Sequence, residues 1–259
     1  MKNRETFRIA DLKTKNIRTA LVIGGGSGMG RSAAVALDRM GIQVFVADLD
    51  VASARETVSN TQAPRNRGEA FQVNVSKSDS VKDLFQALKN RVDRLDLLVH
   101  TAAMLGETVF VEDMTDEEWR RMMAVNLDGV FYACREAVRW MKEHRTGRII
   151  LFSSVASLTP TPGALHYSTS KGGINMMGRT LAKEVARHNI RVNVVAPGYI
   201  ETPMLDGLPD GFSEYIVKNT PLRRLGEPEE IGGLVAFLAS PEADFITGQV
   251  LSPNGGFVI

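Results

Sequence analysis

Short apolar runs alternate with longer segments of helical apolar spacing from residue 19 to the end of the chain. The apolar runs predict strands at 19–23, 42–47, 70–73, 95–99, 148–153, 190–195 and 247–251. The segments between them predict helices at about 31–40, 51–59, 78–92, 115–141, 167–188 and 228–239. Such alternation is typical of an α/β fold, here one doubly wound parallel sheet of about seven strands with helices on both faces.

Two stretches fall outside this alternation. Residues 1–17 are polar with weak periodicity and predict an N-terminal arm before a single domain at 18–259. The segment from about 200 to 227 combines several prolines and glycines with scattered apolar side chains, which predicts a mobile lid. Closing the lid would cover a bound ligand and exclude water. Its apolar residues are Met204, Leu205, Leu208, Phe212 and Tyr215.

Composition excludes several classes of partner. The 259 residues are 44% hydrophobic and 24% charged with a net charge of +1, so no overall field attracts nucleic acid or an anionic membrane. No apolar run approaches the roughly 18–20 residues that span a bilayer, and the polar N-terminus lacks the apolar core of a secretory signal. We therefore expect a cytoplasmic protein with neither kind of partner. The single Cys134 and four scattered histidines indicate no metal site.

A glycine-rich turn follows the first predicted strand directly. The sequence G-G-G-S-G-M-G places Gly24, Gly28 and Gly30 between that strand and the helix at 31–40. Glycines let a backbone turn tightly and approach a pyrophosphate, and the helix N-terminus offers free N–H groups. A glycine run alone also suits an ordinary turn, so its position between strand and helix carries the prediction of a phosphate site.

A carboxylate ends the second predicted strand. Asp48 can accept hydrogen bonds from both ribose hydroxyls of an adenosine, whereas a 2′-phosphate there would be repelled. The alternative is an aspartate that caps the helix at 51–59, and the two roles do not exclude each other.

Three polar residues follow the strand at 148–153. Tyr167 and Lys171 are four positions apart and fall on one helix face, where an ammonium favours the phenolate and moves the tyrosine pKa down from roughly 10. Ser154 lies directly after the strand end, where ligands of open α/β sheets collect. Because no G-x-S-x-G elbow surrounds it, we interpret Ser154 as a hydrogen-bonding group and not a nucleophile. A tyrosine and lysine at this spacing alone are commonly a surface pair.

Together, Ser154, the Tyr167-x-x-x-Lys171 pair and the glycine turn resemble the classical short-chain dehydrogenase/reductase family over about residues 18–256. The resemblance implies a single-domain Rossmann fold in which Tyr167 is the catalytic acid/base. Lys171 would lower its pKa and hold the nicotinamide ribose, and Ser154 would bind the reacting oxygen. Asn126, in V-N-L-D-G, matches the fourth catalytic residue, whose backbone binds a water of the proton relay; the alternative is a structural asparagine.

The resemblance also implies the cofactor NAD(H), preferred over NADP(H) because of Asp48. Asn74 stands where the family usually has an aspartate that contacts the adenine amino group, and its amide oxygen could accept the same bond. The implied cofactor contacts are Gly24, Ser27, Gly28, Met29, Gly30, Asp48, Leu49, Asn74, Val75, Ala102, Tyr167, Lys171, Pro197, Gly198, Ile200 and Thr202.

The largest departure from the family pattern is H-T-A-A at 100–103, where N-N-A-G is usual. The usual asparagine ties the central strands together, and the usual glycine permits close approach of the cofactor. Ala102 and Ala103 are small enough to leave room for a ribose. We expect His100 to be a structural histidine whose hydrogen bonds are satisfied.

The expected activity is hydride transfer between NAD(H) and a moderately apolar small molecule, interconverting a secondary alcohol and a ketone. One alternative is a 3-oxoacyl-(acyl-carrier-protein or CoA) reductase, although many carrier-protein reductases prefer NADPH. Another is a catalytically silent dinucleotide-binding subunit, suggested by the H-T-A-A departure. The resemblance further implies a homotetramer or homodimer in contact through the helices at 115–141 and 167–188.

Overall fold

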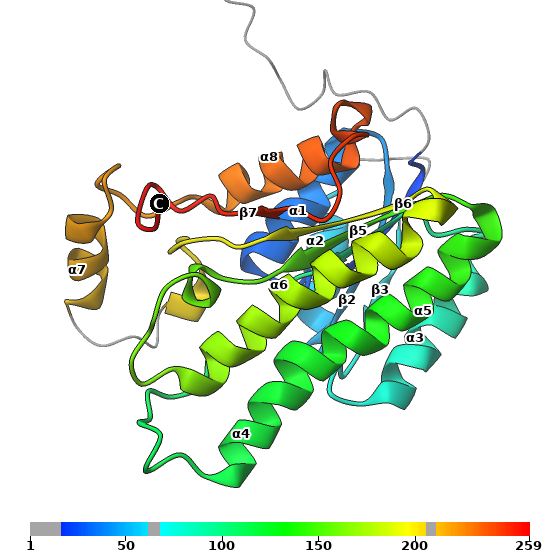
Figure 1. The fold of residues 1–259 in the computed structure, drawn as a ribbon. Coiled ribbons are helices and arrows are strands. Elements are labelled where there is room, and N and C mark those ends of the chain that lie inside the picture. Colours follow the sequence, from blue (N-terminus) through cyan, green and yellow to red (C-terminus); the bar gives the residue numbers. More distant parts are fainter. Residues whose placement is uncertain (1–16, 62–67, 206–210) are drawn as a thin grey trace, which may run out of the picture.

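The computed structural model describes residues 17–61, 68–205 and 211–259, which form one parallel sheet of seven strands. The prediction of a doubly wound α/β fold is confirmed (Figure 1). The strands are β1 (Thr19–Ile23), β2 (Gln43–Asp48), β3 (Ala70–Gln72), β4 (Leu97–His100), β5 (Gly147–Phe152), β6 (Ile190–Val195) and β7 (Val250–Leu251). The strand order is β3-β2-β1-β4-β5-β6-β7. The chain adds strands outward from β1 to β3 on one side and from β4 to β7 on the other, and this change between β1 and β4 creates a crevice beyond the carboxyl ends of the two strands.

Helices cover both faces of the sheet and build two apolar cores (Figure 1). One face is covered by α1 (Gly28–Arg39), α2 (Val51–Ser59) and α8 (Pro228–Ala239). The other is covered by α3 (Ser78–Lys89), α5 (Gly129–His144) and α6 (Leu165–Val185). Because both faces are buried, the strands consist of nearly continuous apolar residues.

The helix predicted at 115–141 is interrupted in the structure. It begins as α4 (Asp116–Met123), where Thr115 and Glu118 form the capping box that T-D-E-E predicts. A π-helical turn, Ala124–Asp128, then separates α4 from α5. Such turns occur frequently at functional sites. The apolar spacing continues through this single widened turn, so the sequence predicted one regular helix. That prediction was wrong here.

The predicted lid contains a helix that its sequence did not indicate, α7 (Phe212–Asn219). Its Phe212 ring packs edge-on against Tyr199, with ring centroids 5.7 Å apart, and Tyr199 also contacts Phe257 at 5.3 Å. A short 3₁₀ turn, Pro203–Leu205, lies at the other end of the segment. Leu208 of the predicted lid and residues 1–16 of the predicted arm lie outside the described residues.

Candidate active site

The glycine turn after β1 is too tightly packed for side chains. Gly24 has a φ of +83°, and its N–H donates to the Ala47 carbonyl oxygen at 2.7 Å. A Cβ on Gly30 would lie 2.1 Å from the Gly24 carbonyl oxygen. The turn leads directly into α1, whose N-cap Ser27 makes no side-chain capping bond. The first N–H groups of α1 are therefore open to an anion such as a pyrophosphate.

Asp48 faces this turn from the end of β2. Its Oδ2 accepts a hydrogen bond from the Gly26 N–H at 2.9 Å, and its Oδ1 accepts one from the Asp50 N–H at 3.2 Å. The helix α2 is capped by Asp50 instead, whose Oδ1 accepts from the Ala52 N–H at 2.9 Å. Asp48 is therefore not the cap of α2, and its carboxylate lies beside the phosphate-binding turn.

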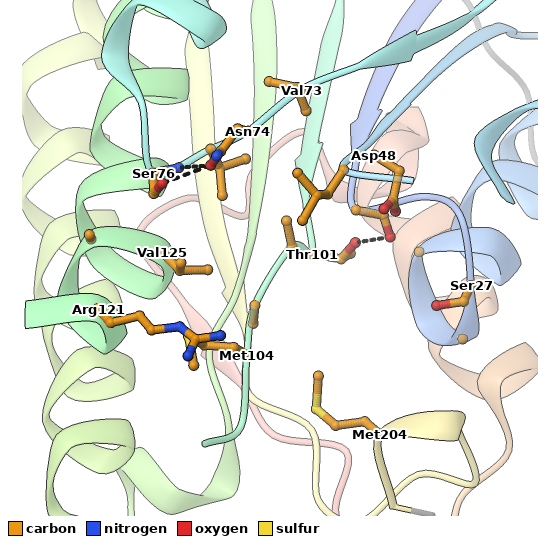
Figure 2. Close-up of a pocket in the computed structure, with 18 of the residues that line it drawn as sticks. Ser27, Asp48, Val73, Asn74, Ser76, Thr101, Met104, Arg121, Val125 and Met204 are labelled. Atoms are coloured by element: carbon orange, nitrogen blue, oxygen red, sulfur yellow. Dashed lines mark hydrogen bonds between the residues drawn. The ribbon is translucent and has the colours of Figure 1, made fainter. Parts of the chain in front are cut away.

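A cleft of about 970 Å³ opens at the carboxyl ends of β1, β2 and β4 (Figure 2). Its size is that of an ordinary small-molecule or cofactor site. The cleft brings together most of the cofactor contacts implied by the sequence, namely Gly24, Ser27, Gly28, Met29, Gly30, Asp48, Leu49, Asn74, Val75, Ala102 and Thr202. Open helix N–H groups, a carboxylate for ribose hydroxyls and closely packed glycines fit a dinucleotide bound along this cleft.

Five implied cofactor contacts do not line the cleft, namely Tyr167, Lys171, Pro197, Gly198 and Ile200. Pro197 and Gly198 join the strand ends, because the Pro197 oxygen accepts from the Val155 N–H at 2.8 Å and the Gly198 N–H donates to the Pro253 oxygen at 3.0 Å. Ile200 is only 5% exposed and packs into the core beside α1 and α8.

Asn74 lies in the cleft, but its side-chain oxygen is already engaged. Oδ1 accepts from the backbone N–H of Ser76 at 3.1 Å and from its hydroxyl at 2.7 Å (Figure 2). An amide oxygen has two lone pairs, so in this structure neither is left for an adenine amino group. The proposed role of Asn74 therefore requires its side chain to turn.

Thr101, to which the sequence pattern assigns no role, ties β4 to the glycine turn. Its hydroxyl lies 3.0 Å from the Ile23 oxygen and 2.9 Å from the Gly24 oxygen, sharing its proton between them. Thr101 thus supplies a link of the kind the family resemblance assigns to asparagine. Its position directly after a strand end is the sequence signal that points to it.

Three basic residues of the cleft were also absent from the sequence-based site. Lys77, Arg120 and Arg121 line it, and Arg121 extends from α4 into the opening (Figure 2). Arg121 is four positions before Val125, another lining residue, so helical spacing places both on one face.

Three of the four candidate catalytic residues converge beyond β5, namely Ser154, Tyr167 and Lys171. Tyr167 and Lys171 are both buried on α6, and Lys171 Nζ lies 5.6 Å from the centroid of the Tyr167 ring. The ammonium donates to the Phe152 oxygen at 3.1 Å. Ser154 lies two residues beyond the end of β5, close enough to Tyr167 for its hydroxyl to lower the pKa of the phenol.

The electrostatics at Tyr167 differ from the expectation. Burial raises its pKa above the usual value of 10.0 and outweighs the nearby Ser154 hydroxyl, which lowers it. Burial also lowers the pKa of Lys171 from 10.5 to about 8. The prediction of a lowered tyrosine pKa was wrong, because desolvation of the buried phenol dominates. The phenol is therefore protonated at neutral pH.

Asn126 lies in the π-helical turn and is fully buried. Its Oδ1 accepts from the Met104 N–H at 2.8 Å, and its Nδ2 donates to the Met104 oxygen at 2.9 Å. Nδ2 also lies 3.3 Å from the Ser170 hydroxyl on α6. Asn126 thus joins the cleft wall at Met104 to the helix that carries Tyr167.

A parallel sheet with a glycine turn at its switch point, an acidic residue at the end of β2 and a buried tyrosine–lysine pair on one helix defines a class, the dinucleotide-dependent oxidoreductases of the Rossmann type. Comparison with known proteins agrees with this class. The family model described as enoyl-(acyl carrier protein) reductase matches residues 24–258.

Several known proteins are similar over nearly their whole length. A 3-oxoacyl-[acyl-carrier-protein] reductase of Thermotoga maritima is 35% identical over 242 residues, covering 93% of this chain and 98% of that protein. A (3R)-3-hydroxyacyl-CoA dehydrogenase of Mus musculus is 36% identical over 245 residues, covering 92% and 95%. A solved short-chain type dehydrogenase/reductase from Mycobacterium marinum superimposes with a TM-score of 0.90 at 29% identity, covering 97% and 99%. The chain belongs to the classical short-chain dehydrogenase/reductase family, which uses a nicotinamide dinucleotide cofactor.

Proposed function

We propose that this protein is an NAD(H)-dependent oxidoreductase that interconverts a secondary alcohol and a ketone, with 3-hydroxyacyl and 3-oxoacyl thioesters as the substrate pair. The observation that carries the proposal is the convergence of Ser154, Tyr167 and Lys171 at the carboxyl end of β5. A nicotinamide, when bound, supplies the hydride. The substrate class rests on the relatives named for 3-oxoacyl-carrier and 3-hydroxyacyl-CoA substrates.

In the direction of ketone reduction, the chain's own residues hold the reacting oxygen and deliver a proton. The hydroxyls of Ser154 and Tyr167 donate hydrogen bonds to the ketone oxygen and orient it. Tyr167 then transfers its proton to that oxygen as negative charge develops there. A raised pKa suits this direction, since the phenol must start protonated. The Lys171 ammonium, buried beside the ring, stabilises the phenolate that remains.

The proposed cofactor is NAD(H), held along the cleft. The helix N-terminus after Gly28 would take the pyrophosphate, and Asp48 would accept the ribose hydroxyls. Since a 2′-phosphate would meet the Asp48 carboxylate, NADPH is expected to be the poorer reductant. The apolar Met104 and Met204 in the cleft wall support a substrate with an apolar chain (Figure 2).

The test is a comparison of substrates and cofactors with the full-length protein. A four-carbon 3-oxoacyl-CoA and a simple ketone of matched length are each supplied with NADH or NADPH, and nicotinamide absorbance is followed. We expect turnover to be fastest with the thioester and NADH. Faster turnover of the simple ketone would overturn the substrate class, and faster turnover with NADPH would overturn the cofactor.

The rival function is a catalytically silent dinucleotide-binding subunit. It predicts that NADH binds, measured by nicotinamide fluorescence, while no ketone in the panel is reduced. The buried Tyr167 beside Ser154 supports the enzyme, because a silent subunit has no need of a buried phenol at that position.

We also propose a homotetramer or homodimer. Phe131 on α5 and Met176 on α6 are 46% and 61% exposed, which supports contact through these helices. Light scattering of the purified protein measures the mass, and a monomer would contradict the proposal.

No helix in the described part of the chain is long and apolar enough to span a membrane.

A further inference from the structure

The imidazole of His100 is buried at the end of β4 and makes no hydrogen bond of good geometry to the described part of the chain. The side chain is 1% exposed, and neither Nδ1 nor Nε2 has a partner among the residues that the structure describes. The expectation of a satisfied structural histidine is therefore wrong. A neutral imidazole carries one N–H donor and one acceptor nitrogen. Leaving the two ring nitrogens unpaired in the interior is unfavourable, so they indicate a further polar group beside His100.

The register of β4 shows which side of the sheet the imidazole faces. His100 lies between Ile23 of β1 and Leu151 of β5. Side chains alternate along a strand, and Leu98, two residues earlier, belongs to the core under α3, α5 and α6. His100 therefore faces α5 and α6, the same side of the sheet from which Lys171 reaches the end of β5.

The charge of Lys171 and the main chain of Gly129 both act on the His100 ring. Burial and the nearby Lys171 ammonium lower the pKa of His100 to about 3, so the imidazole is neutral and keeps a lone pair. The main chain of Gly129, at the start of α5, lies close enough to the ring to raise its pKa, but the geometry is too poor for a regular hydrogen bond to either nitrogen. Within residues 17–61, 68–205 and 211–259, Lys171 is the charged group whose field reaches this ring. Its ammonium has three donors, and the structure shows one of them bound, to the Phe152 oxygen.

We propose that His100 is a positioning residue that holds a buried water molecule against the Lys171 ammonium. The water oxygen accepts an N–H bond from Lys171, and one water hydrogen is donated to the free imidazole nitrogen. A buried water needs two to four polar partners, and the imidazole, the ammonium and the Gly129 main chain supply them. An acceptor on the ammonium favours its charged form, so His100 keeps Lys171 cationic as the pH rises. The proposal rests on the proposed function only for the importance of that charge to catalysis.

The test measures the titration of Lys171 directly, in the full-length protein without cofactor. Protein labelled with ¹³C at the lysine Cε is titrated by NMR, and the Lys171 signal is identified by its absence in Lys171→Met. His100→Leu keeps an apolar side chain of similar size but cannot bind water, whereas His100→Gln keeps an amide close to the position of Nε2. We expect the Lys171 pKa to fall by about one unit in His100→Leu and to stay near wild type in His100→Gln.

Activity provides the second readout. In His100→Leu the alkaline limb of the kcat profile should move to lower pH by the same amount, with the KM for the ketone unchanged. An unchanged Lys171 titration in His100→Leu would refute the proposal. If His100→Leu does not fold, a crystal structure of the wild type decides, because the proposal requires a water within hydrogen-bond distance of both His100 and Lys171. A protein without any turnover would refute the proposed function yet leave the NMR result standing.

Discussion

The ammonium of Lys171 lies 5.6 Å from the centre of the Tyr167 ring, and both side chains are buried. One helical turn on α6 holds them together, while the end of β5 supplies the Phe152 oxygen that anchors the ammonium at 3.1 Å. Burial raises the pKa of Tyr167 and lowers the pKa of Lys171, so it favours the neutral form of each side chain. Proton transfer at this site is thus set by desolvation as well as by the pairing of phenol and ammonium.

Removing the phenol hydroxyl should abolish turnover and leave cofactor binding intact. In Tyr167→Phe we expect kcat to fall on the order of 10³-fold, the contribution typical of a positioned acid. The NADH dissociation constant, from fluorescence titration, should change less than about twofold, since the ring remains. Tyr132→Phe on α5, outside the cleft, is the matched control. Retained turnover in Tyr167→Phe would refute the assignment of the acid.

Neutralising Asp48 should relax the choice between cofactors. Asp48→Asn keeps an oxygen that can accept the Gly26 N–H but removes the charge that repels a 2′-phosphate. We expect the ratio of kcat/KM for NADPH to that for NADH to rise by about tenfold. Asp50→Asn is the control, because it removes a nearby charge that caps α2 and lies outside the cleft. An equal rise in both variants would show that the charge of Asp48 is not the selector.

Lys171 is expected to destabilise the fold below its own pKa. The unfolded chain binds this proton up to a pH of about 10.5 and the folded chain only up to about 8, so stability rises between these values as the pH increases. At pH 7 Lys171 is protonated in both states, so the loss of folding stability caused by its burial is fully present. Lys171→Met should therefore raise the free energy of unfolding at pH 7 by about 1–3 kcal/mol, after allowance for the lost bond to Phe152.

Urea unfolding at pH 7 and pH 10 checks this effect. The gain from Lys171→Met should shrink at the higher pH, where the folded wild type has lost the proton. A variant that is less stable than wild type at both values would contradict the cost assigned to the buried ammonium.

A methyl group on Gly30 should disrupt the glycine turn. Its Cβ would lie 2.1 Å from the Gly24 oxygen and 2.5 Å from the Thr101 hydroxyl. We expect Gly30→Ala to lose about 1–3 kcal/mol of stability and to bind NADH weakly. Gly233→Ala on α8 is the matched control, because nothing lies within 4 Å of its Cβ. That variant should gain about 0.5–1 kcal/mol. Thermal and urea unfolding measure both, and comparable losses in the two would contradict the packing argument.

The sequence alone determined the architecture, because the strand and helix periodicities are local and each element carries its own pattern. The strands Thr19–Ile23 and Ile190–Val195 begin and end at the predicted residues. The glycine turn was likewise evident from a local pattern of strand, glycines and helix. The helix α7 was missed because its eight residues follow a segment rich in proline and glycine, which masks so short an apolar pattern.

Only the tertiary structure decided the contacts between residues distant in the chain. The link from Thr101 to the glycine turn, the π-helical turn at Asn126 and the unpaired ring of His100 depend on packing across several elements. The same holds for the pKa of Tyr167, because burial depends on the whole fold while the spacing to Lys171 is local. Residue types and spacing specify which groups can meet along one element, but the desolvation that tunes them arises only when distant elements close around the site.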